Sequence, residues 1–427
     1  MSADTESETS QRRSGPRIGM VLKGHYPPDV RVEKEVRVLV AAGYDVSLLC
    51  LGGDDDPERE RVGGATVTRF RRQEKYGLLQ RGVKTLAYTA TLSDRIWRRE
   101  LVDFVETDDV DVLHVHDLPL VQTAQDVADE YGLPVVADLH ENYPEAVRQW
   151  RRGMPRWRRG VQTVVAPVWR LKRLERRAVA RADRVLTVAE EARAHYLRDC
   201  GADPRTVSVV SNTVDLDVYD PERVAPIESG RGDAAADDEF VVGYVGSFGP
   251  HRGIETAIRA FPAVVDAVPN ARLLLVGGSN EPGYDQGLRE LAAETGVGDR
   301  ITFTGWVDAA DVPGFMAACD VGLVPHVSNA HTETTVPHKL FQYMALSVPV
   351  VATDVGPLGR IVRDAGGGRV VPASDPAAMA TALAALGDDA ELRDRLGESA
   401  RRAVVDRYAW ADDAETLVAL YDDLTGA

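Results

Sequence analysis

The residues best suited to chemistry lie in one stretch, 324–353, where a polar loop leads from an apolar run into a short helix expected to begin near Pro337. Lys339 and His338 precede Gln342 by three and four residues, so the three side chains share one side of that helix. The loop also carries the hydroxyls of Thr332, Thr334 and Thr335. Because unpaired N–H groups at a helix start attract anions, this combination predicts a site for a phosphate carried by a sugar or ribose.

A second loop of similar chemistry, YVGSFGPHRG (244–253), leaves a predicted strand and enters a predicted helix. It presents Arg252 as a second cation, and its glycines permit close approach of the backbone to a ligand. These glycines are Gly246, Gly249 and Gly253. The alternative is a tight turn whose arginine faces solvent. Since Lys339 lies on another strand-to-helix loop of the same half of the chain, we interpret the two cations as a clamp for a diphosphate.

Strands alternate with helices along both halves of the chain, which predicts an α/β fold with two doubly wound, Rossmann-like domains facing each other across a ligand cleft. The expected strands include 17–22, 44–51, 65–70, 110–115, 134–139, 240–245, 272–276 and 321–324, with an acidic loop at 53–60 and a helical region at 78–105. The expected divisions are a disordered tail (1–15), an N-terminal domain (16–210), a linker (211–239), a C-terminal domain (240–400) and a C-terminal helix across the junction (401–427).

Composition narrows the class of protein. With 427 residues and a formal charge of −17, the chain is long enough for two cores and too acidic for general nucleic-acid binding. Three distant cysteines predict free thiols in a reducing cytoplasm, and we expect neither a signal peptide nor a membrane-spanning run. The acidic run 54–56 belongs to an Asp-rich surface loop, so the sequence offers no convincing metal cluster, and we expect no metal and no cofactor.

Seven segments, in this order, carry a resemblance to a known family. They are PPDVRVEKEVRVLVAAGYDV (27–46), HVHDLP (114–119), DLHENYPE (138–145), ADRVLTVAEEAR (182–193), SNTVD (211–215), the loop around Arg252, and HKLFQYMALSVPVVATDVGPL (338–358). From Pro16 almost to the C-terminus, the chain resembles the family 4 (group 1) retaining glycosyltransferases of GT-B fold. The resemblance implies a nucleotide-diphosphate sugar on the C-terminal domain, an acceptor on the N-terminal domain, and metal-independent transfer of a hexose-type sugar with retention of configuration.

The resemblance also implies a donor site, with two departures from the family pattern. Ser247 stands where the family often has an arginine, and Thr334 and Gln342 stand where it often has two glutamates. An amide offers ribose one acceptor and an NH₂ group, so we expect ribose binding with less charge assistance. The expected donor-binding residues are Gly246, Ser247, Gly249, Arg252, Gly253, Gly305, Trp306, Thr334, Thr335, Lys339 and Gln342.

The catalytic residues follow from the resemblance and from the chemistry of transfer, and the acceptor-side residues follow from their positions at the ends of predicted strands or in the loops after them. Negative charge develops on the departing diphosphate, and we expect Arg252 and Lys339 to neutralise it. His140 matches a family histidine that faces the donor sugar, although a capping role is the alternative, and Asp117 is a candidate general base. The expected acceptor-side residues are His25, Arg31, His116 and Glu141.

The segment 148–184 has 13 basic and two acidic residues, a net charge of +11, with Trp150, Trp157 and Trp169 interleaved. Cations and tryptophans on an amphipathic segment predict docking on an anionic membrane surface. The alternative is that these residues form a solvated helix face that binds nothing. Binding of nucleic acid is disfavoured because the chain as a whole is acidic.

Together these features predict a cytoplasmic glycosyltransferase that moves a sugar to a glycan or lipid-linked acceptor, with a peripheral position on the inner face of the cell membrane left open. Two alternatives remain: a GT-B nucleotide-sugar 2-epimerase, which needs no acceptor, and a catalytically silent nucleotide-sugar-binding subunit. A nicotinamide dehydrogenase is disfavoured because no GxGxxG follows the first strand.

Overall fold

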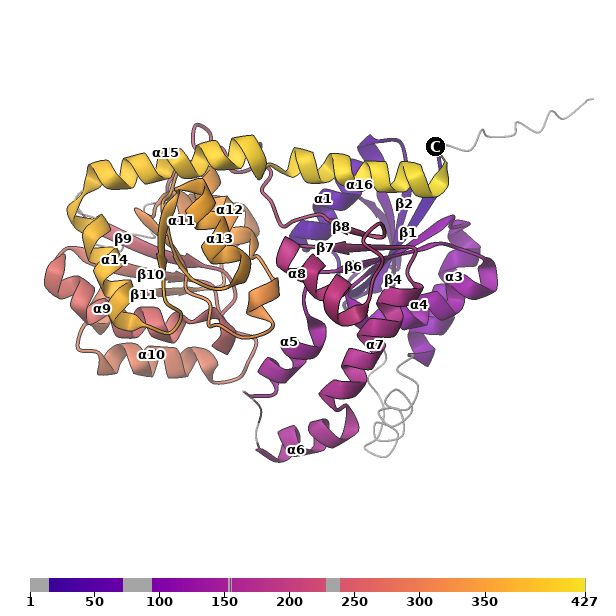
Figure 1. The fold of residues 1–427 in the computed structure, drawn as a ribbon, viewed down its shortest axis with the longest axis horizontal. Helices are drawn as coiled ribbons and strands as arrows, with labels where there is room; N and C mark the ends of the chain where they lie inside the picture. The colour runs from indigo at the N-terminus through magenta and orange to yellow at the C-terminus, as the bar shows by residue number, and fades with distance from the viewer. Residues whose placement is uncertain (1–14, 72–93, 153, 155, 228–238, 427) are drawn as a thin grey trace, which may run out of the picture. The chain divides into compact units, whose positions relative to one another are not determined.

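The structure is a computed structural model that describes residues 15–71, 94–152, 154, 156–227 and 239–426 (Figure 1). The chain divides into two compact units. The first comprises Met1–Asp138, Arg177–Val185 and Thr416–Ala427, and the second comprises Leu139–Arg176 and Leu186–Glu415. This division differs from the domain limits expected from the sequence, because 139–176 and 186–210 go with the second unit. Among the described residues, no helix combines the length and apolar character needed to cross a bilayer.

The first sheet has eight strands in the order β3-β4-β2-β1-β5-β6-β7-β8. The pairings among β4, β2, β1, β5 and β6 are parallel, whereas the edge strand β3 runs antiparallel to β4. The strands are β1 (Arg17–His25), β2 (Asp45–Leu51), β3 (Arg59–Val62), β4 (Ala65–Phe70), β5 (Val112–His116), β6 (Val135–Leu139), β7 (Arg184–Thr187) and β8 (Val207–Val209). Its β1 and β5 are neighbours although a helix and other strands separate them in sequence.

The helices of this half begin at recognisable caps. Asp29 accepts the backbone N–H groups of Arg31 and Val32 at the start of α1, and Asp94 does the same for the first turn of α3. Val32, Val36 and Leu39 then line the buried face of α1, at the spacing of an amphipathic helix. The helices are α1 (Val30–Ala41), α3 (Arg95–Asp108), α4 (Leu118–Tyr131), α5 (Tyr143–Trp150), α6 (Arg156–Val165), α7 (Val168–Arg181) and α8 (Glu190–His195), which continues as a π-helical turn (Tyr196–Cys200).

The second sheet has six strands in the order β11-β10-β9-β12-β13-β14, all parallel. Successive residues of its central strand serve opposite faces: Val241 and Val245 join one hydrophobic cluster, and Val242 and Tyr244 join another. The sheet is therefore buried on both sides, as parallel sheets are. The strands are β9 (Phe240–Val245), β10 (Ala271–Val276), β11 (Ile301–Gly305), β12 (Val321–Val324), β13 (Val350–Thr353) and β14 (Gly368–Val371).

The helices of the second half complete the alternation that the sequence predicts. They are α9 (Ile254–Ala267), α10 (Tyr284–Glu294), α11 (Val312–Ala317), α12 (His338–Ala345), α13 (Gly356–Ala365), α14 (Pro376–Asp388), α15 (Ala390–Arg407) and α16 (Trp410–Thr425). The division into units passes through α16, so residues from 416 onward belong to the first unit.

The α/β class with two parallel sheets is confirmed, and three local predictions need correction or completion. Residues 59–62, expected to begin in a loop, form the edge strand β3. Pro337 is the N-cap of α12 and not its first helical residue, because its ψ of 144° is extended. Of the helical region expected at 78–105, α3 accounts for the part from Arg95, while 78–93 lies outside the described residues, as does the expected tail up to residue 14.

Candidate functional site

The candidate site lies in the second unit, at the carboxyl ends of β9 and β12. The chain passes from β9 through α9 to β10 on one side, and β12 pairs on the other side of β9. Such a switch in strand order leaves room for a ligand beyond the strand ends. The loop after β9 and the loop after β12 are the two that the sequence predicts to bind phosphate.

Two glycines let these loops approach closely. A Cβ on Gly246 would lie 2.9 Å from the Lys339 Nζ, and a Cβ on Gly253 would lie 1.8 Å from the carbonyl oxygen of Pro325. Both glycines have positive φ, 131° and 71°. A residue without a side chain fits both places best, because the positive φ and these short contacts disfavour a Cβ, and the predicted approach of the glycines to a ligand stays a prediction.

The head groups of Lys339 and Arg252 share this place. The Lys339 side chain comes from the first turn of α12, is 7% exposed, and holds its ammonium 3.4 Å from the centroid of the Tyr244 ring. Within the described chain, its Nζ makes no hydrogen bond. Burial and then the charge of Arg252 lower the pKa of Lys339 well below its usual value. An anion bound at this point would favour the charged form of Lys339, because it would compensate both the loss of hydration and the repulsion from Arg252.

Arg252 ends the short helix Pro250–Arg252 and directs one nitrogen, Nη1, to within 3.3 Å of the His326 Nε2. Its Nε is buried and has no hydrogen-bond partner among the residues the structure describes. Two neighbouring cations, each with an unused N–H donor, have the charge and the donors that binding of a diphosphate would require.

Three histidines surround these cations, and the sequence did not single out their side chains as site residues. The ring of His251 lies 6.5 Å from that of His326 and 5.5 Å from that of His331, measured between centroids. Burial, followed by the charge of Arg252, lowers the pKa of His251 to about 3 and that of His331 to about 4, and lowers the pKa of His326 as well. At neutral pH the three imidazoles are therefore uncharged. The sequence could have indicated these three histidines only through their positions, since all three lie on the two loops that are predicted to bind phosphate.

The loop after β12 is held by its own side chains. The Glu333 carboxylate accepts the Ser328 hydroxyl at 2.7 Å and the Gly356 N–H at 2.7 Å. The Thr332 hydroxyl donates to the Val327 carbonyl at 2.6 Å, and that of Thr334 donates to the His331 carbonyl at 3.0 Å. These hydrogen bonds hold the loop in one conformation, and Glu333 contributes to it by joining the loop to the start of α13.

Gln342 faces a partner that the sequence did not predict. Its Nε2 donates to the hydroxyl of Tyr219 at 2.7 Å in a buried contact. The amide oxygen is the acceptor left for a ligand, which fits the expected loss of charge assistance at this position. Its ribose-binding role stays a prediction, as does that of Thr335.

The remaining donor-side predictions lie close to the glycine loop. Trp306 follows β11 and is 60% exposed, and its Nε1 lies 2.9 Å from where a Cβ on Gly278 would be. Gly278 in turn accepts the N–H of Phe248 at 2.8 Å, which ties this place to the loop after β9. Ser247 is exposed, Gly249 is extended, and Gly305 has a φ of 75°.

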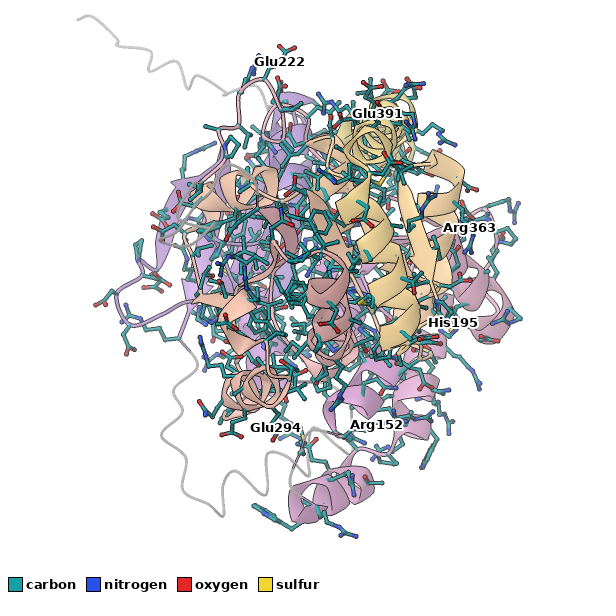
Figure 2. The ribbon with its side chains drawn as sticks, turned by 90° about the vertical axis from the view of Figure 1, so that its left-hand side faces the viewer. Arg152, His195, Glu222, Glu294, Arg363 and Glu391 are labelled. Carbon is teal, nitrogen blue, oxygen red and sulfur yellow. The ribbon has the colours of Figure 1, made fainter. Side chains whose placement is uncertain are left out.

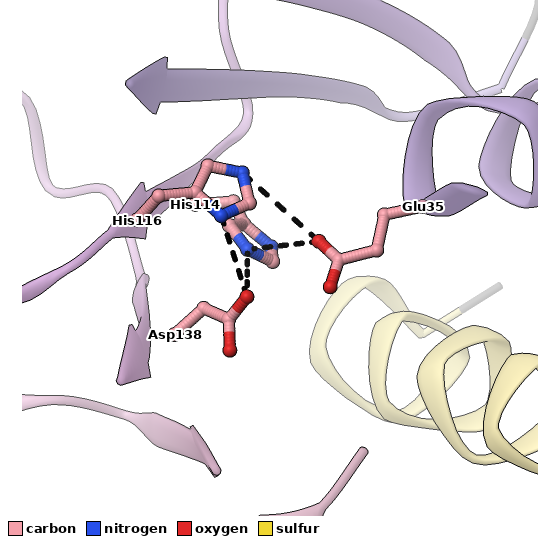
Figure 3. A group of neighbouring side chains, drawn as sticks. All are labelled: Glu35, His114, His116 and Asp138. Atoms are coloured by element: carbon pink, nitrogen blue, oxygen red, sulfur yellow. Dashed lines mark ion pairs between the residues drawn. The ribbon is translucent and has the colours of Figure 1, made fainter. Parts of the chain in front are cut away.

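Figure 3 shows a buried charge cluster of Glu35, His114, His116 and Asp138, and Arg31 contacts two of its carboxylates, so two of the predicted acceptor-side residues, Arg31 and His116, belong to it. The Arg31 guanidinium lies 3.0 Å from the Glu35 carboxylate and donates to Asp138 at 2.8 and 2.9 Å. Arg31 is 3% exposed and His116 is fully buried. Their burial favours a positioning role over direct contact with an acceptor.

The other predicted residues of the first half follow strands β1, β5 and β6. His25 is exposed at the end of β1. Asp117 precedes α4 with a φ of 64°, and its N–H donates to the Asp138 carbonyl. His140 and Glu141 follow β6, and the Glu141 carboxylate lies 3.7 Å from the His331 Nδ1. The catalytic roles of His140 and Asp117 stay predictions.

The basic segment forms α5, α6 and α7, and Figure 2 labels Arg152 between the first two. Trp157, Val161 and Trp169 are 68%, 56% and 65% exposed. Lys172 and Arg148 form ion pairs with Glu145 at 2.7 and 3.0 Å, so only part of the positive charge is compensated locally.

Comparison with known proteins identifies the family of the chain. The family model described as Glycosyltransferase Family 4 matches residues 30–218, and the model described as Glycosyl transferases group 1 matches residues 228–403. The D-inositol 3-phosphate glycosyltransferase of Corynebacterium glutamicum is 30% identical over 253 residues, which are 58% of this chain and 59% of that protein. The enzyme of the same name from Nocardia farcinica is 34% identical over 254 residues, 58% of this chain and 54% of that protein. The chain thus matches little more than half the length of these relatives.

Solved structures establish the fold. Sucrose-phosphate synthase from Thermosynechococcus elongatus superposes with a TM-score of 0.78 at 21% identity, covering 96% of this chain and all of the other. HepE of Anabaena in complex with UDP superposes with a TM-score of 0.71 at 14% identity over 96% of this chain and all of the other. On the family models and these neighbours, the chain is a member of the family 4 (group 1) glycosyltransferases and has the GT-B fold.

Proposed function

We propose that this chain transfers a sugar from a nucleotide-diphosphate sugar to a glycan or lipid-linked acceptor, with retention of configuration. The observation that carries the proposal is the buried ammonium of Lys339 beside the partly buried Arg252, since two neighbouring cations that each have a buried, unused N–H donor are suited to bind an anion. A diphosphate supplies that charge and gains more of it as the sugar leaves. Fixed cations therefore stabilise the transition state more than the bound substrate.

The donor nucleotide is proposed to be uridine diphosphate. HepE, which shares the fold, is described in complex with UDP and with UDP-glucose. The relatives named for D-inositol 3-phosphate favour a hydroxylated acceptor. Trp306, exposed beside the glycine loop, offers a flat apolar face to a base or sugar.

A binding experiment tests the diphosphate site. Thermal unfolding of the full chain is followed with a panel of nucleotide sugars, and the true donor should raise the melting temperature by mass action. Lys339→Met and Arg252→Met should abolish that rise. Arg259→Ala, which removes an exposed arginine from α9, serves as the matched control and should keep it. Equal rises in both site variants and the wild type would place the diphosphate elsewhere.

Product analysis separates the remaining alternatives. The donor is incubated with the enzyme alone and then with lipid extract or oligosaccharide acceptors. Labelled sugar should move to an acceptor, whereas an epimerase would convert the donor without one. A silent subunit would bind the donor in the thermal experiment and release no nucleotide in either assay.

We also propose that α6 and its neighbours dock on anionic lipid at the cytoplasmic face of a membrane. Exposed Trp157, Val161 and Trp169 can enter the interface while the arginines meet lipid phosphates. Vesicles containing phosphatidylglycerol should sediment the wild type, and Arg156→Ser with Arg159→Ser should weaken this binding in a salt-dependent way. Arg395→Ser with Arg402→Ser, on the distant helix α15, is the control. Equal binding to neutral vesicles would remove the electrostatic part of the proposal.

A further inference from the structure

Two groups of described side chains outside the donor site bring metal-ligand atoms within 4.8 Å of one another. The first is the charge cluster of Glu35, His114, His116 and Asp138 (Figure 3). The second consists of Glu175, His195 and Cys200. In the first group an arginine pairs with two of the carboxylates, whereas among the described residues neither a lysine nor an arginine forms an ion pair with Glu175.

The first cluster already contains a cation. The Arg31 guanidinium contacts the Glu35 and Asp138 carboxylates at 3.0 and 2.8 Å, and all of these side chains are nearly or fully buried. A divalent ion between the same carboxylates would place like charges side by side in a region of low dielectric constant. We therefore assign no metal there.

The second cluster is assembled by the π-helical turn that follows α8. In an α-helix, residue i+5 points about 140° away from residue i, so Cys200 would face away from His195. A π-turn, with its i to i+5 hydrogen bonds, winds more loosely and brings residue i+5 back toward the side of residue i, and here the ligand atoms of His195 and Cys200 lie within 4.8 Å of each other. Glu175 reaches the same place from α7 and is 3% exposed. An unusual backbone turn thus brings sulfur, nitrogen and oxygen ligand atoms together.

The two ring nitrogens of His195 have different surroundings. The Nδ1 lies 2.9 Å from the Asp199 carboxylate, which Arg198 holds through two hydrogen bonds of 3.0 and 2.9 Å. The Nε2 is buried, lies 3.3 Å from the Glu175 carboxylate, and makes no aligned hydrogen bond with any described residue. A metal-binding histidine commonly donates one N–H to a carboxylate and offers its other nitrogen to the ion. A zinc-type ion between the Nε2 and the Glu175 carboxylate, 3.3 Å apart, would take the place of the proton that the imidazole can otherwise hold there.

Cys200 completes the donor set. Its sulfur lies within 4.8 Å of the ligand atoms of Glu175 and His195. A bound zinc ion removes the proton of a thiol outright, so the sulfur would bind as a thiolate. A thiolate and one carboxylate then balance the two charges of the ion, and the Asp199–Arg198 pair is neutral by itself.

We propose that Glu175, His195 and Cys200 bind one zinc-type divalent ion, with Asp199 orienting His195 and water in the fourth position. Thiolate, imidazole and carboxylate are the ligand types that Zn²⁺ takes in tetrahedral sites. The thiol proton passes to solvent on coordination. His195, labelled in Figure 2, has a side chain 13% exposed, so the ion can enter from the surface. The ion would join α7 to the end of α8, independently of sugar transfer.

Cobalt provides the test because it reports its ligands by colour. The reduced full chain, stripped of metal with a chelator, is titrated with Co²⁺ and then with Zn²⁺. One equivalent of Co²⁺ should produce a thiolate-to-cobalt charge-transfer band, and one equivalent of Zn²⁺ should displace it. Cys200→Ser should lose the band, whereas Cys50→Ala, which alters a cysteine of β2, should keep it. Asp199→Asn should weaken Zn²⁺ binding about 10- to 100-fold.

Two results would overturn the proposal. One is a wild-type protein that develops no charge-transfer band with Co²⁺, and the other is a band that survives in Cys200→Ser. If Cys200→Ser does not fold by circular dichroism, His195→Gln replaces it and should lose the visible band intensity of tetrahedral cobalt. A folded His195→Gln protein with an unchanged spectrum would equally refute the site.

Discussion

The two sheets have the same strand order around their central strands, but the cations at their two switch points have different partners. In the first sheet β2-β1-β5-β6 matches β10-β9-β12-β13 of the second, so each has a switch point, between β1 and β5 and between β9 and β12. At the first, Arg31 is paired with Glu35 and Asp138. At the second, Arg252 and Lys339 lie together, and Lys339 Nζ forms no hydrogen bond within the described chain.

The difference shows what distinguishes a binding site from a structural charge cluster. Both places are buried and rich in histidine, so neither burial nor residue type separates them. The balance of charge separates them, because Arg31 forms ion pairs with two carboxylates at the first switch point, whereas at the second neither Arg252 nor Lys339 forms an ion pair with any residue that the structure describes. Substitution of the cation should therefore have opposite effects on stability at the two places.

The largest effect is expected from Arg31→Met. It leaves the Glu35 and Asp138 carboxylates buried without their guanidinium, so the free energy of unfolding should fall by about 3–5 kcal/mol. Urea unfolding at neutral pH measures this. Arg37→Met, on the exposed face of the same helix, should change the value by less than about 0.5 kcal/mol. A loss below about 1 kcal/mol for Arg31→Met would mean that the cluster does not depend on this cation.

Lys339→Met should separate activity from stability. Turnover should fall by about 10²- to 10³-fold because a charge that stabilises the leaving diphosphate is gone. The unfolding free energy without ligand should stay the same or rise, since removal of a buried charge removes its desolvation penalty. Steady-state kinetics and urea unfolding of the same preparation test both points. A fall of more than about 2 kcal/mol in stability would make Lys339 a structural residue like Arg31.

The sequence was sufficient for the parts of this comparison that depend on local pattern. Alternating apolar strands and helices predicted both sheets, and a cation on each of two strand-to-helix loops predicted the pair Arg252 and Lys339. It was insufficient where tertiary packing decides the environment of a side chain. Arg31 and His116 were expected beside the acceptor because they follow or end strands, but contacts with Glu35 and Asp138 bury them.

The same limit explains the missed histidines and the partner of Gln342. His251 and His326 become neighbours of Arg252 because β9 and β12 are adjacent, although 74 residues separate Arg252 from His326 along the chain. Tyr219, whose hydroxyl accepts a hydrogen bond from the Gln342 amide, lies 123 residues away along the chain. Pairings of such separation leave no periodic trace in the sequence.

A pH effect should mark the second switch point. His251 and His331 have pKa values lowered by burial to about 3 and about 4, so between these values and about 6.5 the unfolded chain binds protons that the folded chain does not. Stability should therefore fall on acidification, by about 1.4 kcal/mol per pH unit for each histidine in this range. Urea unfolding between pH 7 and pH 5 measures the slope.

Two comparisons identify the source of that slope. His331→Asn should make it shallower than in the wild type, and a bound nucleoside diphosphate should do the same, because negative charge favours the imidazolium. His25→Asn, at the exposed end of β1, is the control for loss of a histidine. A slope unaffected by both His331→Asn and the ligand would assign the acid sensitivity to another part of the chain.

The smallest effect concerns how α16 closes the first switch point. Burial, and then the charge of Glu35, raises the pKa of Tyr421 well above its usual value, so its hydroxyl keeps a proton that it can donate to the His114 Nδ1, 2.5 Å away. Tyr421→Phe should cost about 1–2 kcal/mol of unfolding free energy, because His114 is fully buried and water cannot replace the donor. Tyr44→Phe removes a bond to Asp422 near the surface and should cost less. Donor binding should be unchanged in both, since the hydroxyl serves the paired cluster. An unchanged stability in Tyr421→Phe would mean that His114 has another donor and that α16 does not complete the cluster.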